Sequence, residues 1–242
     1  AAGDRNVFSQ LQGVRFRNFG IVGDRSVACR GIELSGVHEF ECDNLLIYGL
    51  NGSAIDLTDT PPVRESYFYG LRIWYCGNLT EQAMRILSPR GGALGPDEHN
   101  GLYFYDNKII YPYGGGLLID SPEGVGARHL SWHNSHFEGM GIDINKVAAL
   151  TQGDLVHIVR ASRNIRFTSS QFGGQSGYAS GTAKGYAALR LGSLAGGKKI
   201  EKDVSLYGCY LGGFYSHSTG GAGIVQEACA NLSIYGTRLE SN

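Results

Sequence analysis

Residues 13–21 are GVRFRNFGI and residues 164–174 are NIRFTSSQFGG. Each stretch has a short run of alternating apolar residues, then a polar residue at Asn18 or Ser169, then a second short apolar run. Alternation of this kind is the period of a β-strand. A residue such as Asn readily adopts the left-handed backbone angles of a sharp turn. Both stretches therefore predict a strand, a bend and a second strand.

The same unit recurs along the chain, with its second apolar residue at positions 16, 47, 68, 104, 132, 167, 206 and 234. The mean spacing is about 31 residues, with a range of about 21 to 39, as in a repeat that carries inserted loops. The residue after the strand is suited to a bend in every unit except at Ser169. These residues are Asn18, Gly49, Gly70, Asp106, Asn134, Ser169, Gly208 and Gly236.

Two further strands complete each unit. The second strand ends in an apolar residue: Ile73, Ile109, Phe137, Phe172, Leu211 or Leu239. The third is an apolar–any–apolar triplet at 32–34, 55–57, 84–86, 117–119, 142–144 and 189–191. We expect each strand to pair with its counterpart in the next winding. The sequence thus predicts an all-β, single-stranded right-handed parallel β-helix, a solenoid with three short strands per coil and about 7–8 coils. It would form one domain over residues 1–242, and its right hand follows from the preference of parallel crossovers.

The segments 13–21 and 164–174 resemble strand–turn–strand units of bacteriophage tailspike depolymerases, within the pectate-lyase-like right-handed parallel β-helix family. The resemblance covers residues 8 to 242. It implies a trimeric phage tailspike that acts on bacterial capsule or lipopolysaccharide, located in the virion tail or outside the cell. Such proteins usually carry an N-terminal particle-binding segment and a C-terminal trimerisation segment. Neither is recognisable in this sequence, so we expect a fragment or core of a longer polypeptide.

Composition narrows the classes of function. The chain has 21 basic and 22 acidic side chains, which gives a formal net charge of −1. Near-neutrality argues against a nucleic-acid partner, and no apolar run approaches the ~18 residues of a membrane span. The five cysteines form no CxxC pair, so we expect neither a disulfide framework nor a zinc site. No cofactor motif is present, and we expect neither a cofactor nor a metal.

In a solenoid, outward residues at equivalent positions form columns along the axis. The outward position before each bend holds Arg17, Tyr48, Tyr69, Tyr105, His133, Thr168, Tyr207 and Tyr235. These tyrosines could stack on sugar rings, or they could simply stabilise neighbouring strands by packing against each other. The candidate substrate-binding residues are Tyr69, Tyr105, Lys108, Trp74 and Arg85, all predicted to point outward.

Residues 128–145, RHLSWHNSHFEGMGIDIN, concentrate acids and histidines in one central coil. By alternation His133, His136, Glu138 and Asp143 all point outward, so they are the candidate catalytic residues. Asp120, one coil earlier, is an alternative second carboxylate. Glycoside hydrolysis needs two carboxyl groups about 5–5.5 Å apart for retention or about 6.5–9.5 Å apart for inversion. The sequence leaves both spacings open.

The expected function is a polysaccharide depolymerase, a glycoside hydrolase that cleaves a bacterial surface polysaccharide. Hydrolysis is favoured because acidic pairs are available and no strongly basic stripe is evident. The alternative is a lyase, in which a histidine removes the proton α to a uronate carboxylate while Lys108 or Arg128 neutralises the acid. A non-catalytic β-helix that binds glycan or a receptor is the third interpretation.

Overall fold

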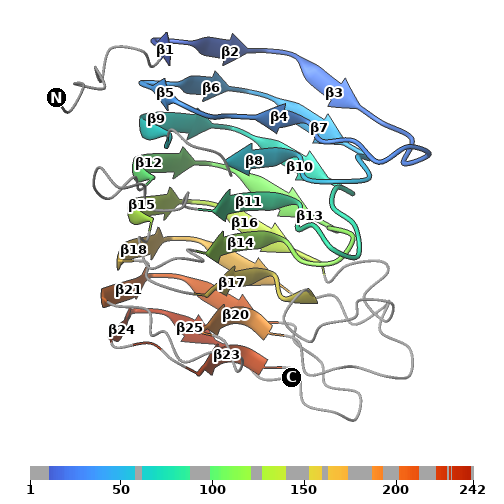
Figure 1. Cartoon of the computed structure of the whole chain (residues 1–242). Helices are drawn as coiled ribbons and strands as arrows, with labels where there is room; N and C mark the ends of the chain where they lie inside the picture. The colour runs from blue at the N-terminus through green and yellow to red at the C-terminus, as the bar shows by residue number, and fades with distance from the viewer. Residues whose placement is uncertain are drawn as a thin grey trace, which may run out of the picture.

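The chain winds as a stack of coils in which the strands of successive coils lie side by side (Figure 1). The computed structural model describes residues 11–57, 62–87, 99–120, 127–139, 153–159, 163–173, 187–192, 202–212, 222–227, 229 and 231–240. Every strand pair among these residues is parallel, and the strands form three sheets of ten, eight and seven strands. This arrangement confirms the predicted parallel β-helix. None of the described segments is a helix long and apolar enough to cross a membrane.

Each coil except the last described one contributes strands to all three sheets. The first sheet contains β1 (Leu11–Gln12), β2 (Arg15–Arg17), β5 (Val37–His38), β6 (Glu41–Asp43), β9 (Arg64–Tyr69), β12 (Asn100–Tyr105), β15 (Arg128–His133), β18 (Arg163–Thr168), β21 (Lys202–Tyr207) and β24 (Leu232–Tyr235). The second contains β3 (Gly20–Val22), β7 (Leu46–Tyr48), β10 (Arg72–Trp74), β13 (Lys108–Ile110), β16 (His136–Glu138), β19 (Gln171–Gly173), β22 (Tyr210–Gly212) and β25 (Arg238–Leu239). The third contains β4 (Ile32–Glu33), β8 (Ile55–Leu57), β11 (Met84–Leu87), β14 (Leu117–Asp120), β17 (Val156–Ile158), β20 (Ala187–Leu191) and β23 (Ala222–Gln226).

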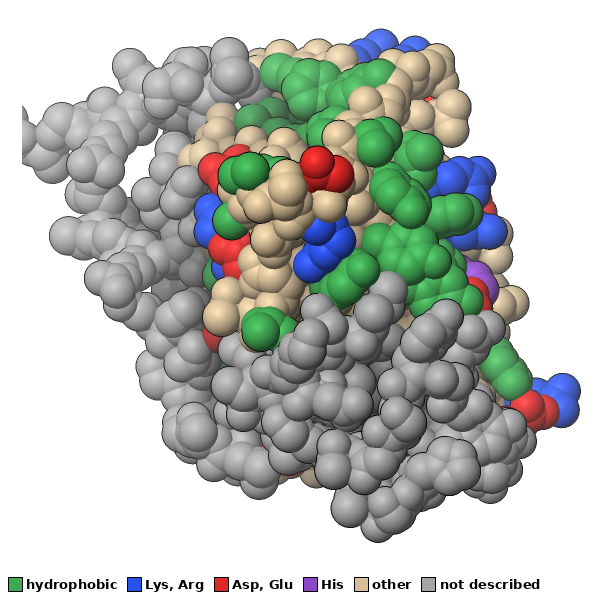
Figure 2. All heavy atoms as spheres, turned by 90° about the vertical axis from the view of Figure 1, so that its right-hand side faces the viewer, with side chains coloured by type: hydrophobic (Ala, Val, Ile, Leu, Met, Phe, Trp, Pro, Cys, Tyr) green, Lys and Arg blue, Asp and Glu red, His purple; other side chains and the backbone are tan. Residues whose placement is uncertain are grey.

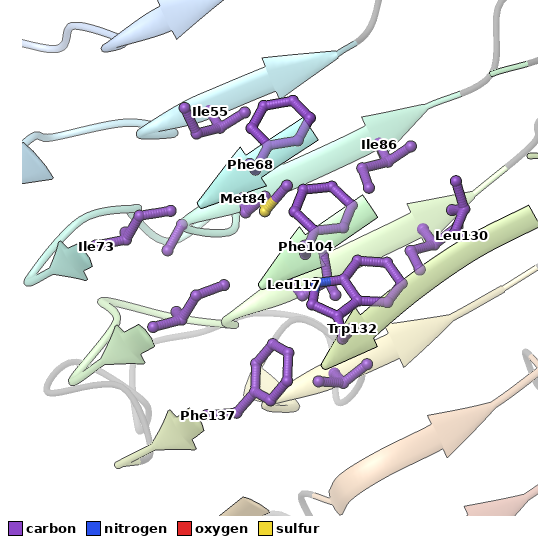
Figure 3. Packing of buried hydrophobic residues seen from close by; sticks show 14 of the residues in the cluster. Ile55, Phe68, Ile73, Met84, Ile86, Phe104, Leu117, Leu130, Trp132 and Phe137 are labelled. Carbon is purple, nitrogen blue, oxygen red and sulfur yellow. The ribbon is translucent and has the colours of Figure 1, made fainter. Parts of the chain in front are cut away.

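A column of stacked rings fills the core behind the first sheet. The ring centroids of Phe68 and Phe104, and those of Phe104 and Trp132, lie 4.6 Å apart. Phe167 extends the column 5.0 Å beyond Trp132. These four side chains are buried, and Figure 3 shows the first three one above another. Because side chains alternate along a strand, the residues between the rings point outward and form the outer face of the first sheet.

Left-handed residues form the bend between the first and second sheets. The positive-φ residues at this corner are Asn18, Asn44, Gly70, Asp106, Asn134, Ser169, Gly208 and Gly236. The predicted bends are confirmed at seven of these places, including Ser169, whose residue type gave no indication. Side chains at this corner also form hydrogen bonds between coils. For example, Asn44 Nδ2 donates to Asn18 Oδ1 at 2.9 Å.

The second coil corrects the predicted register. Residues 45–49 were expected to form a first strand and its bend, but β7 lies in the second sheet, where Tyr48 pairs with Val22 and Trp74. The first-sheet place belongs to β6, whose Cys42 pairs with Phe16 and Phe68. Gly49 does have a positive φ of 69°, but it lies at the next corner, after the second strand. An apolar triplet followed by Gly looks the same at both corners, and this explains the misassignment.

The third sheet carries a second correction. The triplet 142–144 was expected to supply a third strand, but β17 occupies the place between β14 and β20. His157 therefore pairs with Leu118 on one side and Arg190 on the other. Asp143, predicted to point outward from this sheet, lies outside the described residues. Apolar triplets occur on both sides of the inserted residues, and spacing alone could not distinguish them.

A kink interrupts the first-sheet strands of five successive coils. Its members all have positive φ: Glu65, Gly101, His129, Asn164 and Asp203. The register resumes on either side, since Asn100 pairs with Arg128 and Leu102 with Leu130. The residues just before the kink form a column of Arg64, Asn100, Arg128, Arg163 and Lys202. Four of these five are basic, a recurrence that the sequence-based prediction did not anticipate. That prediction assumed strict alternation of inward and outward residues. The kink breaks this alternation, so the column was not predicted.

His99 links three coil segments in the interior and makes stability depend on pH. Its Nδ1 accepts a hydrogen bond from the Val63 N–H at 3.0 Å, so Nε2 carries the proton and lies 3.1 Å from the Leu87 carbonyl oxygen. Burial lowers the pKa of His99 from 6.5 to about 4. The unfolded chain gains a proton below pH 6.5 that the folded chain cannot bind, so stability falls as the pH drops from about 6.5 to about 4.

We expect this loss to be about 3 kcal/mol across that interval, measured as the free energy of unfolding in urea at several pH values. In His99→Gln the part of the slope that arises from this residue should disappear, whatever the variant's absolute stability. An unchanged slope in His99→Gln would contradict the assignment.

Candidate functional site

The structure distributes the predicted catalytic residues over different faces. His133 lies on the first sheet, whereas His136 and Glu138 lie on the second sheet beyond the bend at Asn134. Asp120 ends a strand of the third sheet. The structure therefore brings His136 and Glu138 together, with Nε2 and Oε2 3.3 Å apart, but places His133 on another face.

His136 and Glu138 lie on β16, an inner strand of the second sheet, in a polar region of its outer face. Lys108 pairs with His136 in the neighbouring coil, and Ile110 pairs with Glu138. The pKa of His136 is lowered by burial, with a smaller contribution from Lys108, while Glu138 acts in the opposite direction. His136 is therefore a neutral imidazole at pH 7 with one carboxylate beside it.

The coils that precede this polar region present an apolar surface on the second sheet. Val22, Leu46, Tyr48 and Trp74 lie together on the second sheet and are exposed. Figure 2 shows hydrophobic side chains gathered on this side of the molecule. Trp74, predicted to bind substrate, thus lies in an apolar patch with few polar groups to orient a sugar.

Arg85 contacts a buried carboxylate. It forms a short ion pair with Asp56, whose side chain is fully buried, and Arg30 Nε lies 3.2 Å from the same carboxylate. Glu81 adds a second acid 3.6 Å from Arg85. These contacts give Arg85 a structural role on the third sheet.

The outer face of the first sheet contains a groove of about 650 Å³. Its lining spans five coils and consists of Tyr103, Tyr105, His129, Leu130, Ser131, His133, Asn164, Ile165, Arg166, Asp203, Ser205, Tyr207 and Ser233. Two predicted residues, Tyr105 and His133, belong to it. Tyr69 continues the same column one coil further, as the register predicted.

Side-chain size explains where the hollow lies. The outward column three residues before the bend is Tyr67, Tyr103, Ser131, Arg166, Ser205 and Ser233. Large rings give way to serine hydroxyls, which leave room for a ligand beside the neighbouring column. The kink contributes His129, Asn164 and Asp203 to the opposite edge of the groove.

Stacked rings lie at both ends of the groove along the solenoid axis. At the N-terminal end Tyr67 stacks on Tyr103 at 5.1 Å, and Tyr105 stacks on His133 at 5.0 Å between ring centroids. At the C-terminal end Tyr207 stacks on Tyr235 at 5.0 Å. Burial raises the pKa of Tyr103, so its phenol remains protonated at neutral pH and can donate a hydrogen bond.

The polar groups of the groove are of mixed charge. The pKa of His133 is lowered by burial and by Arg166, which leaves a neutral imidazole at pH 7. The Arg166 guanidinium carbon lies 5.3 Å from the centroid of the Tyr207 ring. At the kinked edge, Asn231 Nδ2 donates to Asp203 Oδ1 at 3.0 Å. The groove can therefore offer a neutral base, a cation, a carboxylate and several hydroxyls.

Sequence reasoning missed Ser131, Arg166 and Ser205. Alternation alone places them outward, but the candidates were chosen from the position next to the bend. The change from Tyr to Ser along this column was the available signal. The kink residues gave a weaker one, because Gly, Asn, Asp and His favour positive φ but Glu does not.

No family model matches the chain, and a search of curated proteins finds no matching sequence.

Proposed function

We propose that the protein binds a bacterial surface polysaccharide in the groove on the outer face of the first sheet. The observation that supports this most strongly is the combination of an open groove of about 650 Å³ with stacked tyrosines at both of its ends and serine hydroxyls along its length. The C–H faces of sugar rings pack on aromatic planes, and their hydroxyls need closely placed polar partners. The groove crosses several coils and suits a polymer better than a small molecule.

Cleavage of the bound polysaccharide is the second candidate function, as expected for a depolymerase. Neutral His133 and cationic Arg166 in one groove favour this function, since a base and an anion-binding group are the parts that elimination requires. Asp203 is the one carboxylate among the described residues that line the groove, so a hydrolase would need a second acid. Product analysis separates the two reactions: hydrolysis yields only new reducing ends, whereas elimination adds absorbance at about 232 nm.

We also propose the assembly implied by the tailspike resemblance, a homotrimer in a virion tail or outside the cell. The exposed apolar residues Val22, Tyr48 and Trp74 on the second sheet support a protein contact on a face separate from the groove. Sedimentation equilibrium tests this assembly, and a monomer at all concentrations would contradict it.

Tyr105→Ala and Tyr207→Ala are expected to weaken polysaccharide binding at least about tenfold each, because each removes a ring from one end of the groove. Isothermal titration against the polysaccharide selected from an array of purified capsules and lipopolysaccharides provides the measurement. Tyr48→Ala, on the second sheet, is the matched control and should bind as the parent does. Equal affinities for all four proteins would exclude the groove as the binding site.

A further inference from the structure

Arg166 lies in the middle strand of the groove and is exposed. In the register of the first sheet its neighbours are Ser131 on one side and Ser205 on the other. Both are short, so the space along the axis on either side of the guanidinium is open. The five donors of an arginine are therefore presented to the groove between two hydroxyl-bearing residues.

No acidic partner neutralises this cation among the described residues. Its interactions there are the contact with the Tyr207 ring at 5.3 Å and the electrostatic effect on His133. Asp203, the groove's carboxylate, instead accepts a hydrogen bond from Asn231. By contrast, the buried arginines of the third sheet, such as Arg190, pair with carboxylates. Arg166 is thus an unneutralised charge in the place where a ligand would lie.

A second observation also indicates a ligand. The Ser131 hydroxyl lines the groove, its oxygen is buried, and it has no hydrogen-bond partner among the described residues. Buried hydroxyls are normally bonded, so an unsatisfied one next to a cation indicates that an acceptor belongs there.

We propose that the polysaccharide unit over the centre of the groove carries an anionic group that binds Arg166 and Ser131. The shared chemistry is an oxyanion: the carboxylate of an acidic sugar, or a sulfate or phosphate ester. Arginine binds such groups through paired hydrogen bonds that are stronger than those between neutral partners. This inference rests on the proposed function and specifies its ligand class.

The test uses an array of purified bacterial polysaccharides in which each uronate-containing member is accompanied by its carboxyl-reduced derivative. Members with sulfate or phosphate esters are paired with their de-esterified forms. The parent should bind an acidic member 10- to 100-fold more tightly than its neutral derivative. Arg166→Met should lose this preference while it binds the neutral derivative as the parent does, and Arg166→Lys should recover part of it. The pair that shows the preference identifies the anion.

Arg72→Met, an exposed arginine replaced on the second sheet, is the control and should behave as the parent. Equal binding of acidic and neutral members by the parent would overturn the inference and leave the proposed function intact. So would an unchanged preference in Arg166→Met. Failure of every polysaccharide to bind the parent would overturn both.

Discussion

Trp132→Ala is expected to lower the free energy of unfolding by about 4 kcal/mol. The indole is buried and stacked between Phe104, 4.6 Å away, and Phe167, 5.0 Å away. Removal of the ring leaves a void shared by three coils, and backbones fixed by hydrogen bonds on both sides cannot close it. Urea denaturation followed by circular dichroism measures the loss.

Trp74→Ala is the matched control, because the chain has two tryptophans and Trp74 is partly exposed on the second sheet. We expect it to cost below about 1 kcal/mol. Trp132→Phe should restore most of the stability by restoring the stack. If Trp132→Ala unfolds at the same urea concentration as the parent, the continuous ring column is not what holds these coils together.

Asp154→Ala is expected to cost 3–5 kcal/mol, since it leaves a buried guanidinium with part of its partners missing. Asp154 Oδ2 lies 2.7 Å from Arg190 Nε, and Oδ1 accepts a hydrogen bond from the Ala187 N–H at 2.7 Å. Both side chains are almost fully buried, and the variant would keep the ion pair of Arg190 with Glu227. Thermal or urea unfolding provides the measurement.

Glu33→Gln is the comparison for this variant. It breaks the ion pair of Glu33 with Arg30, in which the glutamate side chain is 54% exposed. Exposed pairs contribute about 0–1 kcal/mol, so the variant should differ little from the parent. Similar losses in Asp154→Ala and Glu33→Gln would mean that burial of the Asp154–Arg190 pair does not determine its importance.

The repeat made the fold predictable from sequence because one strand–bend–strand pattern recurs in every coil. The errors of the sequence-based prediction arose where the same local pattern fits two different places in a coil. Gly49 marks a genuine bend, but at a different corner from Gly70, and only the pairing of Cys42 with Phe68 shows which corner it is. Stacking at a distance, and not local sequence, decides such cases.

The site was less predictable for a related reason. Alternation predicts whether a side chain points in or out, but the bend at Asn134 decides which face it joins, so His133 and His136 diverge. The kink at His129 reverses the local alternation and conceals both the groove edge and the basic column. The composition of a single strand is a poor guide to this kink. The kink is marked by positive φ at the equivalent position of five successive coils.

The outward columns divide ligand recognition into separate contributions from each winding. Each winding adds one side chain to each column, and successive windings are about 4.8 Å apart, so a polymer laid along the axis is inspected at regular intervals. Exchange of Ser205 or Ser233 alters one interval while the interior rings stay in place. Diversification toward new surface glycans can then proceed one winding at a time, at little risk to the architecture.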